Sequence, residues 1–133
     1  MTILHRARAT LRIMGDDLEP AEVSRLLGVE PSLAYRKGEL ALVTKRRRPA
    51  KLGMWQFQCP PMKPSDFDAQ VAMLLSPLTQ DMKIWKRLGM KYRVDLFCGW
   101  FMREENEGEE ISPGTLVALG SRHIRLSLDI YSP

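Results

Sequence analysis

The fold is decided by one stretch near the start of the chain, RATLRIMGDDLEPAEV at residues 8–23. In its first half, apolar side chains recur at every second position, at Ala9, Leu11 and Ile13. A period of two residues is typical of a strand with one buried face. The second half opens a helix at Pro20, since proline suits a first helical position, where its missing N–H is no loss. The stretch therefore predicts a strand followed directly by a helix.

The same two patterns recur along the rest of the chain. Residues 33–43 are expected to be extended, with a bend at Lys37-Gly38-Glu39. Alternation predicts strands at 54–58, 92–100 and 124–130, and Cys59-Pro60-Pro61 is expected to end the first of these three. Helical spacing predicts a helix that Ser65 caps and that runs to Gly89, kinked or broken at Pro77. A short helix over 113–119 precedes the last strand, whose apolar residues from Ile124 to Ile130 are expected to face the core.

The order of these elements predicts the α+β class. It matches a ferredoxin-like β-α-β-β-α-β sandwich with an added helix and strand. The 133 residues have the length of one domain, spanning 1–133. We expect the helices to lie mainly on one face of the sheet. The opposite face then carries Arg8, Thr10, Arg12, Arg93, Asp95, Phe97, Arg125, Ser127, Asp129 and Tyr131.

The net charge of +4 comes from one segment. Five of the twenty Lys and Arg residues lie in 45–51, and without them fifteen basic residues stand against sixteen acidic ones. A second segment, 103–110, carries five Glu. Both segments have little apolar surface to bury, so we expect mobile loops near 44–52 and 103–110. The 45–51 loop lacks stacking aromatic residues and a recognition helix, which makes nucleic-acid binding a weaker alternative.

Composition argues against several classes of protein. No apolar run approaches the roughly 18–20 residues of a membrane span, and the first residues lack the apolar core of a signal peptide, so we expect neither insertion nor export. Two cysteines, Cys59 and Cys98, are too few for a disulfide scaffold, so a reduced, cytoplasmic setting is expected. With His5 and His123 as the only histidines, no ligand pair has metal spacing, and neither a metal nor a cofactor is predicted.

The sequence carries no familiar catalytic motif. A Gly-rich phosphate loop, a Gly-x-Ser-x-Gly elbow and a His-Glu-x-x-His helix do not occur in it. Cys98 falls on the inward side of its strand, which favours a buried, inert thiol over a nucleophile. The three tryptophans are favoured as core residues. Trp100, which follows Gly99 at a strand end, is the best placed of them to meet a ligand.

Four aspartates are candidates for a site. Asp16 and Asp17 follow the end of the first strand, where paired carboxylates can hold Mg²⁺ or share a proton, although a turn at a helix entrance is the favoured interpretation. Asp95 and Asp129 fall at outward strand positions, where aspartate is depleted and its presence needs a cause. Cross-strand pairing with nearby arginines is one cause, and a binding surface is the other.

Several motifs, in the same order, resemble one bacterial protein family. They are LRIMGDDLEP at 11–20, LLGVEP at 26–31, RKGE at 36–39, GMW at 53–55, VDLFCGWF at 94–101 and LDIY at 128–131. The family is the one catalogued as domain of unknown function 4279. The resemblance spans nearly the whole chain and implies a small intracellular domain with no established activity. It maps the recurrent polar positions of the family onto Asp16, Asp17, Arg36, Asp95 and Asp129.

Two functions remain open on this evidence. The favoured one is a non-catalytic binding module whose open sheet face meets a protein partner or a second copy of the chain, through candidate residues Asp95, Trp100, Asp129 and Tyr131. The alternative is a small-ligand site or an enzyme, built on Asp16, Asp17, Arg36 and Asp129. That alternative requires those four side chains to converge around one cleft.

Overall fold

A five-stranded sheet organises the computed structural model, which describes residues 2–43 and 46–133. Its strands lie in the order β2-β5-β1-β6-β7, with bounds β1 Arg6–Gly15, β2 Leu33–Tyr35, β5 Gly53–Met62, β6 Arg93–Phe101 and β7 Arg125–Tyr131. Neighbouring strands are antiparallel except β6 and β7, which are parallel because a helical crossover joins them. A separate hairpin is formed by β3, Leu40–Val43, and β4, Arg46–Pro49. The predicted α+β class is confirmed.

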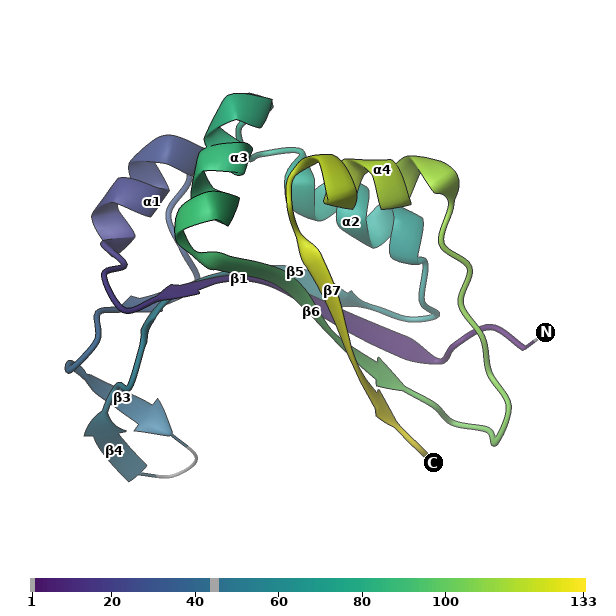
Figure 1. The fold of residues 1–133 in the computed structure, drawn as a ribbon. Helices are drawn as coiled ribbons and strands as arrows, with labels where there is room; N and C mark the ends of the chain where they lie inside the picture. The colour runs from purple at the N-terminus through teal and green to yellow at the C-terminus, as the bar shows by residue number, and fades with distance from the viewer. Residues whose placement is uncertain (1, 44–45) are drawn as a thin grey trace.

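The helices lie on one face of the sheet, as expected (Figure 1). They are α1 Pro20–Leu27, α2 Phe67–Leu75, α3 Met82–Lys91 and α4 Pro113–Ser121. The core lies between the two layers and includes Leu11 and Ile13 of β1 together with Trp55 and Trp85, all without exposed surface. Each of these two indole N–H groups has an acceptor: Trp55 donates to the hydroxyl of Ser24 at 3.0 Å, and Trp85 donates to a backbone carbonyl.

The segment predicted as one long helix forms two. Pro77 breaks it, since α2 ends at Leu75 and α3 begins at Met82. The cap of α2 is Asp66, whose carboxylate accepts the backbone N–H of Ala69 at 3.1 Å, so the prediction of Ser65 as the cap is wrong by one residue. Ser65 is buried, and its hydroxyl donates to Glu109 instead.

Two strands extend beyond the predicted bounds. β5 continues through Pro60 and Pro61, which were expected to end it. It can do so because the pairing with β1 shifts between Ala7 and Ala9, and such an irregularity accommodates residues without an N–H. Arg46–Pro49 forms β4 where a loop was expected; its pairing with β3 satisfies backbone groups, while all four of its own residues stay exposed. Residues 44 and 45 lie outside the described residues, and mobility near 44–52 and 103–110 stays a prediction.

The last strand departs from its predicted burial. Leu126 is half-buried, as its inward position implies, but Leu128 and Ile130 on the same face are 42% and 55% exposed. α4 covers the start of β7 and not its end (Figure 1). The expectation that these two residues face the core is therefore wrong, because no element of the described chain covers that end of the strand.

Candidate binding face

No helix lies over the sheet face opposite the helix layer, so the side chains of that face are not covered by a helix (Figure 1). Strand register places these side chains in rows, which we call rungs, across β1, β6 and β7. The outer rung is Arg6-Phe101-Tyr131, the next is Arg8-Gly99-Asp129, the third is Thr10-Phe97-Ser127, and the inner rung is Arg12-Asp95-Arg125. These twelve residues, with Gln56 and Gln58 of β5, are called the open face below.

The outer rung is a stack of planar groups. The guanidinium carbon of Arg6 lies 4.3 Å from the centroid of the Phe101 ring. That ring stacks on Tyr131 with centroids 4.8 Å apart and planes 4° from parallel. The ring also leans over Gly99, where an added Cβ would come within 3.2 Å of it. Gly99 therefore lets the Phe101 ring lie close to the backbone, and a side chain at this position would require the ring to shift by a few tenths of an ångström.

The inner rung is closed by an ion pair. Arg12 donates to both carboxylate oxygens of Asp95, from Nε at 2.8 Å and from Nη2 at 2.6 Å. The Ser127 hydroxyl donates to the same carboxylate at 3.1 Å, and Asp95 has no exposed surface. The hydrogen bonds that Arg12 donates to Asp95 are the main cause that raises the pKa of Arg12. The guanidinium carbon of Arg12 also lies 4.5 Å from the centroid of the Phe97 ring. Asp95 therefore serves in cross-strand pairing with Arg12. Because Asp95 is fully buried, a partner cannot reach the Asp95 carboxylate.

Between these two rungs the face is hollowed. The hollow measures about 310 Å³ and has Gly99 in its lining, with Arg8, Gln58 and the rings of Phe97 and Phe101 around it. Arg8 is exposed, and within the described part of the chain it forms no ion pair. Asp129 on the same rung accepts the hydroxyl of Tyr131 at 2.6 Å. The hollow thus offers an unpaired cation, amide groups and aromatic surface together.

The structure places the other predicted site residues elsewhere. Asp16 and Asp17 form an exposed turn after β1, and Asp16 pairs with Lys37 at 3.3 Å. Arg36 pairs with Glu19 at 2.8 Å, also in solvent. Asp129 is level with Arg8, and Asp16 follows Arg8 by eight residues, which along an extended strand is on the order of 25 Å. Asp16, Asp17 and Arg36 therefore do not converge with Asp129.

Trp100 lies on the helix side of β6, away from the open face. Its ring meets Phe67 edge-on, with centroids 6.1 Å apart and planes at 78°. Its indole N–H has no hydrogen-bond partner among the described residues. The structure therefore gives Trp100 a packing role, whereas Asp129 and Tyr131 do lie on the open face as predicted.

Two residues of the outer rung were missed from the sequence. Arg6 precedes the predicted start of the first strand, and Phe101 follows the predicted end of the third. Extending the alternation by one more step at each end, from Arg8 to Arg6 and from Gly99 to Phe101, would have found both. Strand ends are the least certain part of such patterns, and here they carry the stack.

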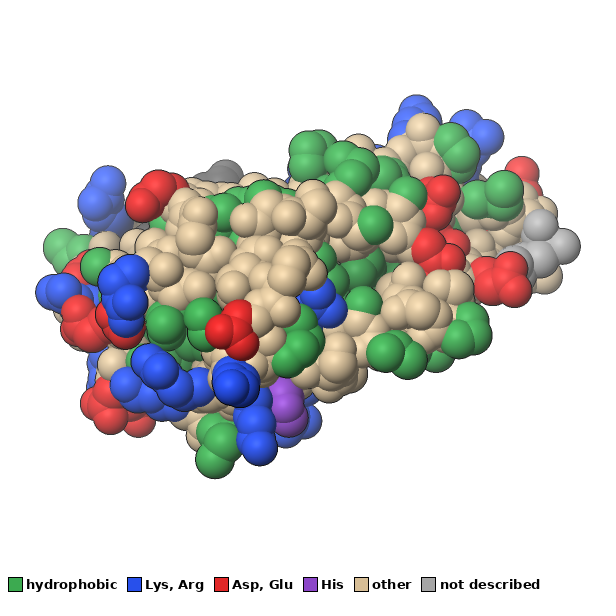
Figure 2. All heavy atoms as spheres, turned by 90° about the horizontal axis from the view of Figure 1, so that it is seen from above, with side chains coloured by type: hydrophobic (Ala, Val, Ile, Leu, Met, Phe, Trp, Pro, Cys, Tyr) green, Lys and Arg blue, Asp and Glu red, His purple; other side chains and the backbone are tan. Residues whose placement is uncertain are grey.

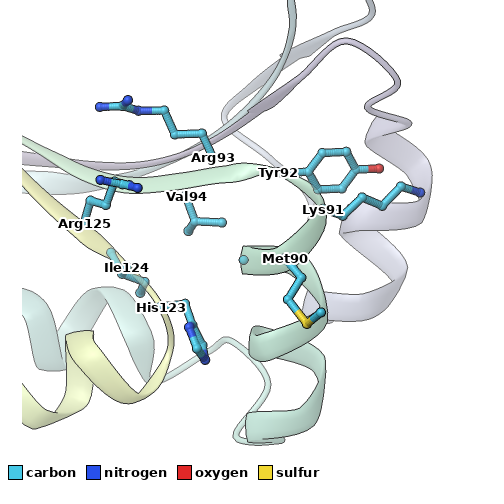
Figure 3. Close-up of a pocket in the computed structure, with 9 residues that line it drawn as sticks. Met90, Lys91, Tyr92, Arg93, Val94, His123, Ile124 and Arg125 are labelled. Atoms are coloured by element: carbon cyan, nitrogen blue, oxygen red, sulfur yellow. The ribbon is translucent and has the colours of Figure 1, made fainter.

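A second hollow, of about 570 Å³, lies at the opposite end of β6 and is lined by Lys91, Arg93, His123 and Arg125 among others (Figure 3). Figure 3 shows Arg93 on one side of β6, with Val94 and His123 on the other. The basic groups are therefore divided between the two faces of the sheet and do not surround one ligand position.

The thiols and the acidic groups give no support to catalytic or metal chemistry. Burial, with a contribution from the charge of Asp95, raises the pKa of Cys98 to about 12, and burial also raises that of Cys59. Neither thiol is therefore ionised near neutral pH. Among residues 2–43 and 46–133, no three His, Cys, Asp or Glu side chains are grouped to hold a metal ion. In the same residues, no helix has the length and apolar character needed to cross a membrane.

These features define a small α+β domain with a helix-covered sheet face and an open face of arginine and aromatic residues. Residues 5–133 match the family described as Domain of unknown function (DUF4279), and the chain belongs to that family. No curated protein and no solved structure matches the chain.

Proposed function

We propose that the protein is a non-catalytic binding module whose open face recognises an acidic surface on a protein partner. The observation that carries the proposal is the hollow beside Arg8, where an unpaired guanidinium lies next to aromatic rings. Arginine and aromatic residues are enriched in protein interfaces and supply much of their binding energy.

The charges of the open face favour an acidic partner. It carries Arg6, Arg8, Arg12 and Arg125 against Asp95 and Asp129. Both carboxylates accept hydrogen bonds within the face, Asp95 from Arg12 and Asp129 from Tyr131. The remaining positive charge would steer a negatively charged partner and select its orientation. Binding is also favoured over catalysis because the buried carboxylate of Asp95 is fully engaged by its neighbours.

The test is an affinity capture from the native host after nuclease treatment, read by mass spectrometry. Arg8→Glu reverses the charge in the hollow, and Lys86→Glu makes the same change on an exposed position of α3, on the helix side. We expect a protein that is captured by the wild type and by Lys86→Glu, and about tenfold less by Arg8→Glu. Equal capture by all three, with all three folded, would contradict the proposal.

Nucleic-acid binding is the second candidate, and the β3–β4 hairpin is the observation that favours it. All four residues of β4 are exposed, and the hairpin projects on the open-face side of the sheet (Figure 1). Its arginines, Arg46, Arg47 and Arg48, add positive charge beside the open face. A labelled single-stranded oligonucleotide should then bind with an affinity that falls steeply with salt, and replacement of the three arginines by serine should weaken it. Absence of binding at low salt removes this candidate.

We also propose that the fold is a ferredoxin-like sandwich with additions, and that the protein acts in the cytoplasm. The strand order β2-β5-β1-β6 with antiparallel neighbours supports the first, with β7, α4 and the β3–β4 hairpin as the additions. Two unpaired, buried cysteines support the second, because they suit a reducing compartment. An experimental structure and cell fractionation test the two statements separately.

A further inference from the structure

β7 ends the sheet, and its backbone shows which groups point outward. The carbonyl of Tyr131 accepts the N–H of Met102 at 3.0 Å, so the backbone groups of Tyr131 face β6. Because these groups alternate along a strand, those of Leu126, Leu128 and Ile130 point away from β6. On that side no strand of the described chain lies beside β7. An edge of this length is a template for pairing with another chain.

Apolar side chains accompany this free edge. Leu128 and Ile130 are 42% and 55% exposed, and on α4 Leu116 and Val117 are 53% and 68% exposed. In the view onto the helix layer, hydrophobic side chains reach the surface along α4 (Figure 2). α4 has no charged residue, and its one buried hydroxyl, Thr115, is bonded to Asp68. A helix that is apolar on all sides is expected to be covered on more than one side.

The sequence of β7 is complementary to itself when read in the opposite direction. If two copies run antiparallel and are centred on Ser127, Arg125 of each lies opposite Asp129 of the other. Leu126 then lies opposite Leu128, which matches the outward-pointing backbone groups of both residues. Arg125 and Asp129 both belong to the open face, so their side chains meet on one side of the joined sheets. Asp129 has a second carboxylate oxygen for this contact, since Tyr131 uses only one.

We propose that two copies of the chain associate through β7 in this antiparallel register, forming one continuous sheet around a two-fold axis at Ser127. The axis is perpendicular to the sheet, so the contact is isologous and each ion pair and each backbone contact occurs twice. The two α4 helices lie on the same side and cover the apolar residues beside the joint. The two open faces likewise lie on one side and form a single extended surface. This inference does not depend on the proposed partner.

Charge exchange across the joint is the first test, read by light scattering after size exclusion. The wild type should have about twice the 15.2 kDa mass of one chain. Arg125→Asp and Asp129→Arg each place like charges opposite one another and should give monomers, whereas the double variant carrying both changes should restore the dimer. Lys86→Glu is the control and should stay dimeric. A monomeric wild type, or single variants that remain dimeric, would overturn the proposal.

Cross-linking tests the register independently. In an antiparallel pair centred on Ser127, the two Ser127 Cα atoms lie about 4.5–5.5 Å apart, within disulfide range. Ser127→Cys should therefore form an intermolecular disulfide under mild oxidation, while the native Cys59 and Cys98 are buried. Ile130→Cys is the matched control, because its two sulfur atoms would lie roughly 20 Å apart. Cross-linking of Ile130→Cys, or none of Ser127→Cys in a folded protein, would show that the register is wrong.

Discussion

Two rungs of the open face each carry an arginine and an aspartate, but the two charges form an ion pair on only one of these rungs. On the inner rung, Arg12 closes on Asp95 through two hydrogen bonds, and Ser127 adds a third. One rung from the outside, Arg8 faces Gly99, and Asp129 lies a strand further away, so the two charges do not pair. Asp95 has no exposed surface, so its charge has lost water and must be paired within the protein. Arg8 is exposed although it lies on the central strand β1, and Asp129 lies on the edge strand β7, so water satisfies both charges and they stay available for a partner.

The largest expected effect comes from opening the inner rung. Asp95→Asn removes the charge from a fully buried side chain and leaves Arg12, whose side chain is 25% exposed, without its partner. Removing one member of a buried pair costs on the order of 3 kcal/mol of unfolding free energy. The measurement is chemical denaturation, fitted for the midpoint and slope.

The control for that variant is an exposed ion pair of the same type. Asp16→Asn breaks the contact with Lys37, in which both side chains are more than half exposed. Such pairs contribute about 0.5 kcal/mol or less. If Asp95→Asn and Asp16→Asn lowered the unfolding free energy equally, burial would not set the contribution of an ion pair, and the contrast between the rungs would be lost.

A smaller loss of unfolding free energy is expected when the positive charge of Arg12 is kept and only its two-point hydrogen bonding is removed. Arg12→Lys keeps the positive charge but cannot donate from two nitrogens to both oxygens of Asp95, so we expect a loss of about 1–2 kcal/mol. Arg8→Lys should leave the unfolding free energy within about 0.5 kcal/mol, because Arg8 has no ion pair in the described structure to lose. Thermal and chemical unfolding of both variants check this. A larger loss for Arg8→Lys than for Arg12→Lys would show that the roles are reversed.

Much of this contrast follows from local patterns, and the decisive part does not. Alternation along Arg8–Ile13 and around Asp95 predicted most of the side chains that share the open face, but not Arg6 and Phe101. The partner of Asp95 was not predicted: the sequence pointed to Arg93 and Arg125, whereas strand order places Arg12 of β1 opposite Asp95. Order and register come from packing between segments far apart in sequence, which no single stretch encodes.

The same limit explains the errors at the margins. β5 runs through Pro60 and Pro61 because the shift in its pairing with β1 accommodates them, and that shift belongs to both strands. Ile130 lies at an inward position of the alternating pattern but is exposed, because α4 covers the start of β7 and does not reach Ile130. The prediction that Asp16 and Arg36 converge with Asp129 was wrong for a related reason. Their positions in the chain are informative only once the strand that carries Asp129 has a place and a direction in the sheet.

The smallest expected effect lies at the outer rung. The hydrogen bond that Tyr131 donates to Asp129, together with the charge of that carboxylate, raises the pKa of Tyr131 above its ordinary value of 10.0. Asp129→Asn removes the charge, so the pKa of Tyr131 should fall back toward 10.0. The folded state favours the neutral phenol, and this stabilising contribution is therefore present below pH 10 and lost as the pH rises through the folded-state value.

Phenolate absorbance measures this shift as the difference between each protein and its Tyr131→Phe counterpart, which isolates one of the three tyrosines. Asp16→Asn serves as the control, since Asp16 lies at the opposite end of the sheet, and it should leave the pKa of Tyr131 unchanged. An unchanged value in Asp129→Asn would mean that water, and not Tyr131, satisfies the Asp129 carboxylate. Asp129 would then be released from Tyr131, and both of its carboxylate oxygens would be available to meet Arg125 of a second copy.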